Sequence, residues 1–224
     1  DLHLSIRRQR QMCIRDRTEG INLVAQSYGL KNFKKGDEII LSQLEHHSNI
    51  VPWQLLRDKL NIKINVLPIN KTGDIDLKKF KELLTKKTKL VSILHVSNAL
   101  GTIIPIKELI DISHKKEIPV LVDGCQSVPH MKVDVKNLDA DFYCFSGHKI
   151  YGPTGIGILY CKKEYLEKHI PKAIFWDVDE HSDKDSSYPH MMPNSDYWTR
   201  MLWRFGIKNI DWGRRGDSFC CNAN

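Results

Sequence analysis

The lysine at position 149 is the side chain of this sequence with the strongest case for covalent chemistry. It follows the largely apolar run Phe142–Ser146, and its nearest neighbours are glycine, histidine and aromatic residues rather than other charges. An apolar pocket removes the hydration that stabilises an ammonium group, so the pKa of such a lysine falls and its neutral amine can attack an aldehyde. The setting of Lys149 therefore favours a lysine that forms a Schiff base, although most lysines of the chain are expected at the surface.

An acid, Asp123, ends a second apolar run, Val120–Asp123, and is followed by a glycine that allows a sharp turn. An aspartate in this position could pair with a protonated ring nitrogen of a cofactor and make the ring an electron sink. The alternative interpretation is that Asp123 only caps the next helix.

Three more polar side chains stand where an expected strand ends or an expected helix begins. His46 follows the strand expected at 37–41, and it could stack on a planar ring or act as an acid–base group near neutral pH. Asn98 follows the strand expected at 89–95, and it could bond a ring oxygen or a substrate carboxylate, or simply form a turn. Thr18 begins an expected helix, whose free N–H groups suit a phosphate.

Taken together, an acid, a lysine, a histidine, an amide and a helix start suited to phosphate form the chemistry of pyridoxal 5′-phosphate. The glycines after Lys149 (GPTGIG, 152–157) suit a close approach of the backbone to a cofactor, but no Gly-Lys-Ser/Thr follows them as in a P-loop. No metal is expected, because the histidines and cysteines lack the spacing of zinc ligands.

The elements that must position these side chains alternate between strands and helices. Strands are expected at 37–41, 62–67, 89–95, 119–123, 141–146 and 155–160, and helices at 18–29, 50–61, 77–84, 106–116 and 162–168. The strands are continuously apolar, which predicts an α/β fold with a mostly parallel sheet and helices on both faces. Sites in such folds lie outside the carboxyl ends of the strands.

Composition narrows the class of protein further. The 224 residues are 41% hydrophobic and 27% charged, and no apolar run approaches the roughly 18 residues that cross a bilayer, so no membrane association is expected. Residues 1–17 lack the apolar core of a secretory signal. Six cysteines without a C-x-x-C pair are expected to be free thiols in a reducing cytoplasm.

The net charge of +7 could suggest a nucleic-acid-binding protein. However, residues 1–17 carry five arginines and two aspartates, and residues 200–224 carry five basic and two acidic residues, so little net charge lies between them. The nucleic-acid interpretation is therefore a remote alternative. Between residues 18 and 199 the basic residues are lysines, with Arg57 as the single arginine, and this abrupt change of usage marks both ends as different from the middle.

Five segments of the chain closely resemble one enzyme family. They are TEGINLVAQSYG (18–29), ILSQLEHHSNIVPWQLL (40–56), HVSNALGT (95–102), VLVDGCQSVPH (120–130) and DFYCFSGHKIYGPTGIGILY (141–160). The family is that of the SufS-type cysteine desulfurases, also called selenocysteine lyases, which are pyridoxal-phosphate enzymes of aminotransferase class V. The resemblance runs from Thr18 to about Pro171, and it implies the large domain of the fold type I pyridoxal-phosphate enzymes, here incomplete.

The resemblance implies a role for each residue around the cofactor ring. Lys149 would be the Schiff-base lysine, and Asp123 would hold the proton of the pyridine nitrogen. Gln126 would bond the phenolic oxygen, His46 would stack on the ring and act in catalysis, and Asn98 would meet the substrate carboxylate side of the pocket.

The phosphate of the cofactor would be held by Thr18, Ser146 and His148. Cys125 stands where the family commonly has alanine, and it is interpreted as a small filler rather than a nucleophile.

The implied reaction converts L-cysteine or L-selenocysteine into L-alanine. Lys149 would take the α-proton, an enzyme thiolate would accept the sulfur as a persulfide, and an acceptor protein would pass it on to iron–sulfur cluster assembly. The parent enzyme is expected to be a homodimer in the cytoplasm. Another class V pyridoxal-phosphate enzyme, an aminotransferase or a kynureninase-like lyase, is the alternative.

The sequence departs from the family pattern at both ends. Asp16-Arg17 replaces Gly-Thr before Thr18, where a carboxylate would repel a phosphate unless Arg17 compensates, and nothing matches the R-x-G-x-x-C-type loop of the catalytic cysteine. We therefore expect a non-native extension at 1–17, a pyridoxal-phosphate-binding domain at 18–171 and an unrelated or out-of-frame, poorly ordered tail at 172–224. This chain alone is expected to be an inactive fragment that releases no sulfide.

Overall fold

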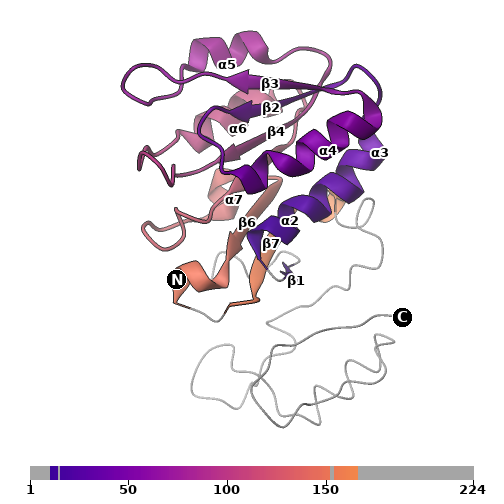
Figure 1. The fold of residues 1–224 in the computed structure, drawn as a ribbon. Coiled ribbons are helices and arrows are strands. Elements are labelled where there is room, and N and C mark those ends of the chain that lie inside the picture. Colours follow the sequence, from indigo (N-terminus) through magenta and orange to yellow (C-terminus); the bar gives the residue numbers. More distant parts are fainter. Residues whose placement is uncertain (1–10, 15, 152–153, 166–224) are drawn as a thin grey trace, which may run out of the picture. The chain divides into compact units, whose positions relative to one another are not determined.

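The central layer of the computed structural model, which describes residues 11–14, 16–151 and 154–165, is a seven-stranded sheet (Figure 1). Its order is β1-β7-β6-β5-β4-β2-β3. The strands are β1 (Gln11–Ile14), β2 (Glu38–Ser42), β3 (Lys63–Leu67), β4 (Thr88–Leu94), β5 (Val120–Asp123), β6 (Phe142–Ser146) and β7 (Gly157–Cys161). Strands β3, β2, β4, β5 and β6 are parallel, β7 is antiparallel to β6, and β1 is antiparallel to β7. The prediction of a mostly parallel sheet is confirmed.

Helices cover the sheet on both faces. They are α2 (Arg17–Val24), α3 (Leu30–Asn32), α4 (Val51–Leu60), α5 (Leu77–Leu83), α6 (Ile106–His114) and α7 (Val135–Leu138), together with the π-helix η1 (Ala25–Gly29) and the 3₁₀ helices η2 (His47–Asn49) and η3 (Gly147–Ile150). Alternate residues of a strand point to opposite faces, and so Phe142 of β6 packs in the core under α2 and α4, whereas Tyr143 packs in the core under α6. The strands read as continuous apolar runs in the sequence because both of their faces are buried.

Helix α2 begins one residue earlier than the sequence predicts. The expected start was Thr18, but the helix begins at Arg17, and Asp16 caps it by accepting a 2.8 Å hydrogen bond from the Glu19 N–H. The expected stop at Gly29 is also wrong, because the chain continues helically to Asn32. Gly29 is needed for another reason: a Cβ there would lie 2.8 Å from Leu56 Cδ2 of α4.

Residues 11–14, which the sequence analysis assigned to an extension, form β1 and pair with β7 from Gln11–Tyr160 to Ile14–Gly157. Gly157 permits this approach, because a Cβ there would lie 2.7 Å from the Asp16 backbone. Residues 1–10 and the tail at 172–224 lie outside the described residues. Of the helix expected at 162–168, residues 163–165 are helical and residues 166–168 lie outside the described residues. In the part of the chain that the structure describes, no helix has the length and hydrophobicity that crossing a bilayer requires.

A polar cluster fastens α6 to the end of the sheet opposite the carboxyl ends of the parallel strands. His114 Nε2 lies 2.8 Å from Asp141 Oδ2, and its Nδ1 lies 3.1 Å from Asp139. Lys162 bridges the same two aspartates at 2.7 and 2.9 Å, and the Val120 N–H donates to Asp141. The hydrogen bond to Asp141, which outweighs burial, raises the pKa of His114 above its usual value.

We expect His114→Asn to destabilise the fold more at pH 6 than at pH 9. Since the folded-state pKa is raised, the stabilisation is fully present below the unfolded pKa of His, about 6.5, and is lost as the pH rises through the folded value. A loss of about 1–2 kcal/mol is expected at pH 6 from urea unfolding. The exposed His130→Asn serves as the control, and equal losses for His114→Asn at both pH values would contradict the expectation.

Candidate functional site

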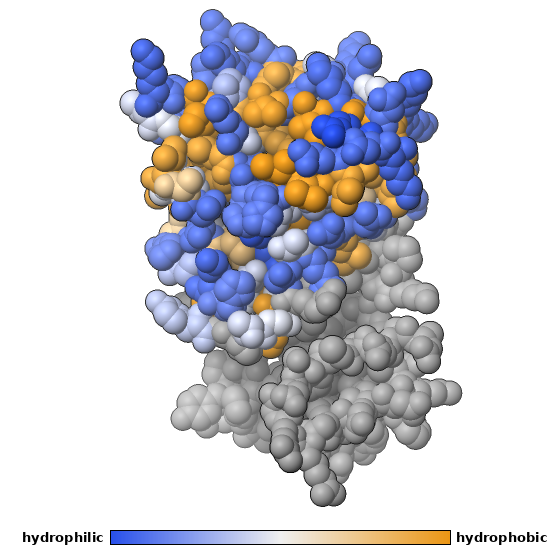
Figure 2. Space-filling model, viewed as in Figure 1, coloured by the Kyte–Doolittle hydropathy of each residue, from blue (hydrophilic) through white to orange (hydrophobic). Residues whose placement is uncertain are grey.

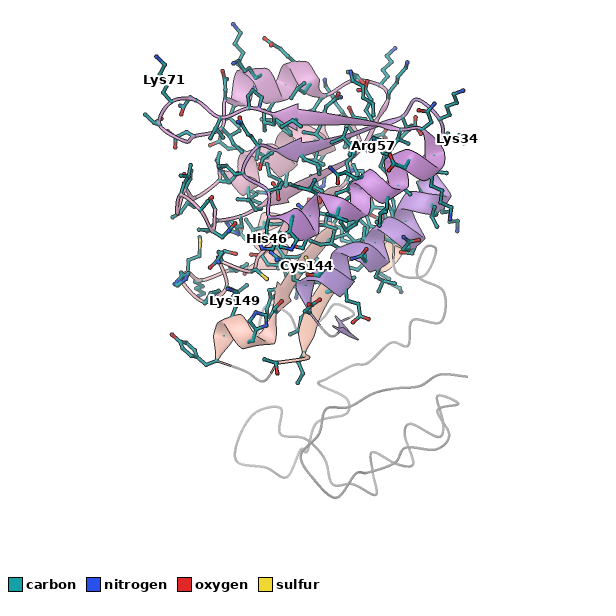
Figure 3. The ribbon with its side chains drawn as sticks, viewed as in Figure 1. Lys34, His46, Arg57, Lys71, Cys144 and Lys149 are labelled. Carbon is teal, nitrogen blue, oxygen red and sulfur yellow. The ribbon has the colours of Figure 1, made fainter. Side chains whose placement is uncertain are left out.

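The carboxyl ends of the parallel strands gather the predicted site residues at one edge of the sheet, where Figure 3 shows His46 and Lys149. A cavity of about 90 Å³ lies there. Five of the eight predicted site residues line it: His46, Asn98, Asp123, Gln126 and Lys149. Arg17 and Cys125 also line this cavity. Lysine and aspartate therefore face one common space, as a lysine–acid pair around a cofactor requires.

Lys149 lies in η3, the turn that directly follows β6. It is an exposed residue, so the burial that the sequence analysis expected around its amine is not found among the described residues. Because Lys149 is exposed and also lines the cavity, a small molecule that enters the cavity can contact it.

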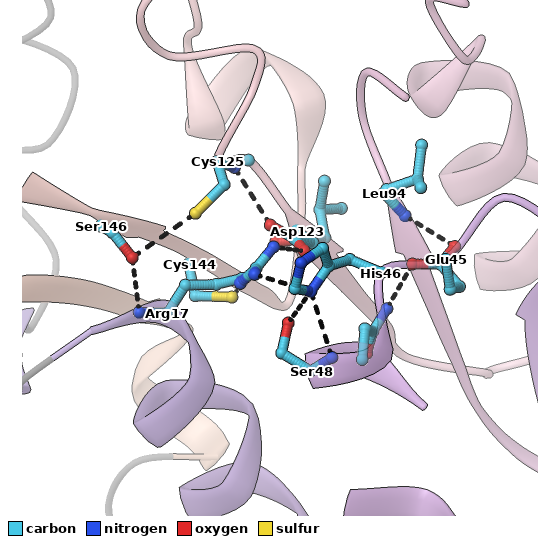
Figure 4. A network of polar contacts seen from close by, with 12 residues as sticks. Arg17, Glu45, His46, Ser48, Leu94, Asp123, Cys125, Cys144 and Ser146 are labelled. Atoms are coloured by element: carbon cyan, nitrogen blue, oxygen red, sulfur yellow. Dashed lines mark hydrogen bonds and ion pairs between the residues drawn. The ribbon is translucent and has the colours of Figure 1, made fainter. Parts of the chain in front are cut away.

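Asp123 ends β5 and is 3% exposed. Its Oδ1 accepts the Cys125 N–H at 3.1 Å, and its Oδ2 lies 2.6 Å from Arg17 Nη1 (Figure 4). Burial raises the pKa of Asp123, and the Arg17 guanidinium opposes that shift. Asp123 thus holds the turn after β5, where no helix follows directly, and it also lines the cavity; its pairing with a cofactor ring stays a prediction.

Arg17 is the site residue that the sequence analysis did not predict in this role. Its side chain is 14% exposed, and its Nη2 lies 3.1 Å from His46 Nδ1. Its Nε is buried and has no hydrogen-bond partner among the described residues. Burial is the largest single influence on the pKa of Arg17 and lowers it, but the charge of Asp123, the hydrogen bond to Asp123 and the nearby Cys125 and Cys144 together outweigh burial and raise that pKa. Arg17 was expected to compensate the negative charge of Asp16 near a phosphate. Its guanidinium pairs with Asp123 instead.

His46 caps η2 through its own ring. Its Nδ1 accepts the Ser48 N–H at 3.2 Å as well as the Arg17 contact, so Nδ1 is unprotonated. Burial and the nearby positive charge of Arg17 lower the pKa of His46. A neutral imidazole at the cavity wall suits a group that lies against a planar ring.

The three residues predicted to hold a phosphate are not among those that line the cavity. Ser146 is buried at the end of β6, and its Oγ accepts the Arg17 N–H at 2.9 Å. Thr18 is the second residue of α2, and His148 is exposed in η3. Ser146 therefore already contacts the N-terminus of α2, which is the element predicted to bind phosphate.

Beneath the His46 turn lies a buried acid, Glu45, which is 8% exposed. Its carboxylate accepts hydrogen bonds from the Ser42 hydroxyl at 2.5 Å, the Asn49 amide at 2.7 Å and the Leu94 N–H at 3.0 Å. These bonds join the ends of β2 and β4 to the turn that carries His46. Burial raises the pKa of Glu45 to about 7, although the three donors oppose it.

We expect Glu45→Gln to destabilise the fold by about 1–3 kcal/mol, because the new amide group must face one of three donors. The pH dependence is a second readout: a folded pKa raised from 4.5 to about 7 means that wild-type stability falls as the pH rises through that window. Urea unfolding at pH 5 and pH 8 measures both effects, with the exposed Glu108→Gln as the control. A wild-type stability that rises from pH 5 to 8 relative to the variant would contradict this.

Gly124, after Asp123, is required for packing as well as for the turn. A Cβ at this position would lie 2.0 Å from Tyr143 Cε1. The Tyr143 hydroxyl in turn contacts Ser127 at 2.7 Å and His95 at 3.1 Å. The Tyr143 side chain, held by its hydroxyl, thus packs directly against the backbone next to Asp123.

The side chains at the cavity have the chemical groups that pyridoxal phosphate requires. One existing contact, the ion pair of Arg17 with Asp123, would have to be replaced by a contact with the cofactor. A carboxylate, an amine, an imidazole and two amides are the groups that such a ring requires. The Asp123 oxygen that faces the cavity, however, is paired with Arg17. Among the described residues no group of three His, Cys, Asp or Glu side chains could hold a metal ion.

Comparisons with known proteins find similar sequences over most of this chain. Residues 11–177 match the family model described as aminotransferase class-V. A cysteine desulfurase of Synechococcus elongatus is 51% identical over 158 residues, which are 70% of this chain and 25% of that protein. A cysteine desulfurase of Escherichia coli (strain K12 / DH10B) is 47% identical over 192 residues, or 86% of this chain and 45% of that protein.

Solved structures resemble the fold as well. The cysteine desulfurase CsdA from Escherichia coli superposes with a TM-score of 0.70 at 36% identity, over 84% of this chain and 46% of that one. The apo cysteine desulfurase from Thermococcus onnurineus NA1 gives a TM-score of 0.70 at 35% identity, over 88% and 53%. The chain spans less than half of the length of these curated relatives.

Proposed function

Because this chain belongs to the class-V aminotransferase family, we propose that it provides the pyridoxal-phosphate site of a cysteine desulfurase. The reaction converts L-cysteine or L-selenocysteine into L-alanine. The observation that carries the proposal is the common cavity of Lys149 and Asp123 at the ends of neighbouring strands. The relatives named cysteine desulfurase support the choice of reaction.

When bound, pyridoxal phosphate supplies an electron sink for the negative charge that develops at the substrate Cα. Lys149 is the residue that would hold the cofactor aldehyde through its Nζ, and the same amine, once the substrate amine has displaced it, would take the α-proton, which its exposed position allows. Asp123 would hold the proton of the ring nitrogen, Gln126 would bond the phenolic oxygen, His46 would lie against the ring, and Asn98 would bind on the substrate carboxylate side. All five line the cavity.

Thr18, Ser146 and His148 are proposed to hold the phosphate. The N-terminus of α2 provides N–H groups and a favourable dipole, and the Ser146 hydroxyl lies 2.9 Å from one of those nitrogens. The Asp16 carboxylate caps the same helix end, and its charge opposes the phosphate.

The sulfur step transfers neutral sulfur to an enzyme thiolate. A new S–S bond forms, the substrate Cβ–Sγ bond breaks with its electrons left on carbon, and a proton completes alanine. Cys125, Cys144 and Cys161 are free and buried. Burial raises the pKa of each thiol, which suits core residues and supports Cys125 as a filler rather than a nucleophile.

The proposed partners follow from the same reaction. A persulfide requires an acceptor protein, here one of iron–sulfur cluster assembly in the cytoplasm. A homodimer is supported by exposed apolar side chains, among them Val51 and Leu55 at 44% and 54% exposure on α4, the helix on the face that Figure 2 shows. Leu100 and Ile103 are also more than half exposed.

Hydrogen exchange at the substrate Cα tests the proposal. The chain is incubated with pyridoxal phosphate and L-cysteine in D₂O, and deuterium at Cα and any keto acid are measured by mass spectrometry. We expect deuterated cysteine, in excess over cofactor alone, without keto acid. Keto acid formation would indicate an aminotransferase instead, and exchange no faster than with the free cofactor would contradict the proposed site.

A further inference from the structure

We infer that Arg17 competes with pyridoxal phosphate for Asp123, so that the cofactor binds only after the guanidinium has released this carboxylate. The inference rests on the proposed function, and it concerns a residue that none of the predicted cofactor contacts includes. Arg17 is the first residue of α2, and its side chain reaches the end of β5 across the cavity wall.

Arg17 engages three of the groups proposed to hold the cofactor. Its Nη1 lies 2.6 Å from Asp123 Oδ2, its Nη2 lies 3.1 Å from His46 Nδ1, and its backbone N–H donates to Ser146 Oγ at 2.9 Å (Figure 4). The side chain therefore occupies the ring-nitrogen partner, Asp123, and also contacts the histidine proposed to stack on the ring, whereas the backbone contact does not depend on the side chain.

The charges in the cavity explain why Arg17 takes this position. A carboxylate that is 3% exposed is costly without a counter-ion, and Arg17 is the cation paired with it among the described residues. Yet Arg17 itself is incompletely satisfied, because its buried Nε has no partner in the described part of the chain. A pyridinium N–H is an alternative donor to Asp123, so the two cations are exchangeable but exclude one another.

This exchange lowers the apparent affinity for the cofactor. A ligand that binds only the released state has its dissociation constant raised by the inverse of the fraction of chains in that state. Removing the side chain of Arg17 removes that penalty, and the cofactor then supplies the missing partner of Asp123.

The test is a pyridoxal phosphate titration of the wild-type chain, Arg17→Thr and Arg57→Thr. Arg57 is a matched control, since it is paired with the neighbouring Asp58 on the surface, away from the site (Figure 3). Binding is followed by cofactor absorbance, and borohydride reduction with peptide mapping shows where the cofactor is attached. We expect Arg17→Thr to bind at least about tenfold more tightly than the wild type, with attachment at Lys149, and Arg57→Thr to be unchanged.

A second measurement covers the case in which Arg17→Thr does not give the circular dichroism spectrum of the folded wild type. Arg17→Met keeps the aliphatic stem and removes the charged donors, and the same tighter binding is expected. Equal affinities for wild type and variants, with attachment at Lys149 in all, would overturn the competition while leaving the proposed function intact. If no variant carries cofactor at Lys149, the proposed function fails and the inference fails with it.

Discussion

Replacing Lys149 by alanine reduces cofactor-dependent hydrogen exchange at the Cα of cysteine by about a hundred- to ten-thousandfold. The amine of Lys149 is the group that lines the cavity opposite Asp123 and can both bond an aldehyde and accept a proton. Because the residue is exposed in η3, its truncation removes no buried packing, so the fold is expected to be unaffected.

Lys71→Ala is the matched control for this prediction. Lys71 is exposed and lies far from Lys149 in Figure 3, so it offers an equally accessible amine without the cavity. Exchange is measured by mass spectrometry, with circular dichroism to establish that each variant is folded. If Lys149→Ala retained the exchange rate of the wild type, Lys149 would not be the catalytic amine.

Replacing Asp123 by asparagine is expected to lower the exchange rate by about a hundredfold or more, because a neutral amide cannot stabilise a protonated ring nitrogen. The substitution also separates the two interpretations of Asp123. Asparagine keeps a side-chain oxygen that can accept the Cys125 N–H, so a residue that only holds the turn would tolerate it.

The exposed Asp111→Asn, which removes an acid paired with Lys107 on α6, is the control for charge alone. A second readout is the apparent affinity for pyridoxal phosphate, expected to fall with Asp123→Asn because the ring nitrogen loses its anionic partner. Full exchange activity of Asp123→Asn would leave Asp123 with a structural role in the turn and no part in the chemistry.

Much of the fold was predictable, because buried parallel strands are continuously apolar and their boundaries carry turn residues. The six strands expected from the sequence are β2 to β7, each with bounds within two residues. The sheet edge that carries the site followed from topology, since the carboxyl ends of parallel strands lie together. Strand β1 was missed, because the four residues Gln11–Ile14 carry no pattern that exceeds that of a loop.

The place of several predicted site residues in the fold was predictable for a similar reason. Residues that end strands, such as Asp123, or follow them closely, such as His46 and Lys149, line the cavity. The exposure of Lys149 was not predictable, because it depends on which other segments cover η3. The role of Arg17 was equally hidden, since its contact with Asp123 spans 106 positions of the sequence.

The hydrogen bonds of Glu45 were also not predictable from the sequence. The sequence marks Glu45 only as the neighbour of His46, whereas its burial and its bond to Leu94, 49 positions away, arise when β2 and β4 pair. Charged residues are usually solvated, so the residues that neighbour Glu45 in the sequence do not indicate that it is buried. An acidic residue next to a candidate site residue, at the end of an apolar strand, is the signal that could have found it.

The most direct measurement is the site at which this chain carries pyridoxal phosphate after borohydride reduction. The chain is incubated with the cofactor, reduced, digested, and its peptides are sequenced by mass spectrometry. The cavity shared by Lys149 and Asp123 predicts one dominant modified peptide, with the phosphopyridoxyl group on Lys149. A label scattered over the exposed lysines, with Lys149 no richer than Lys71, would contradict the account.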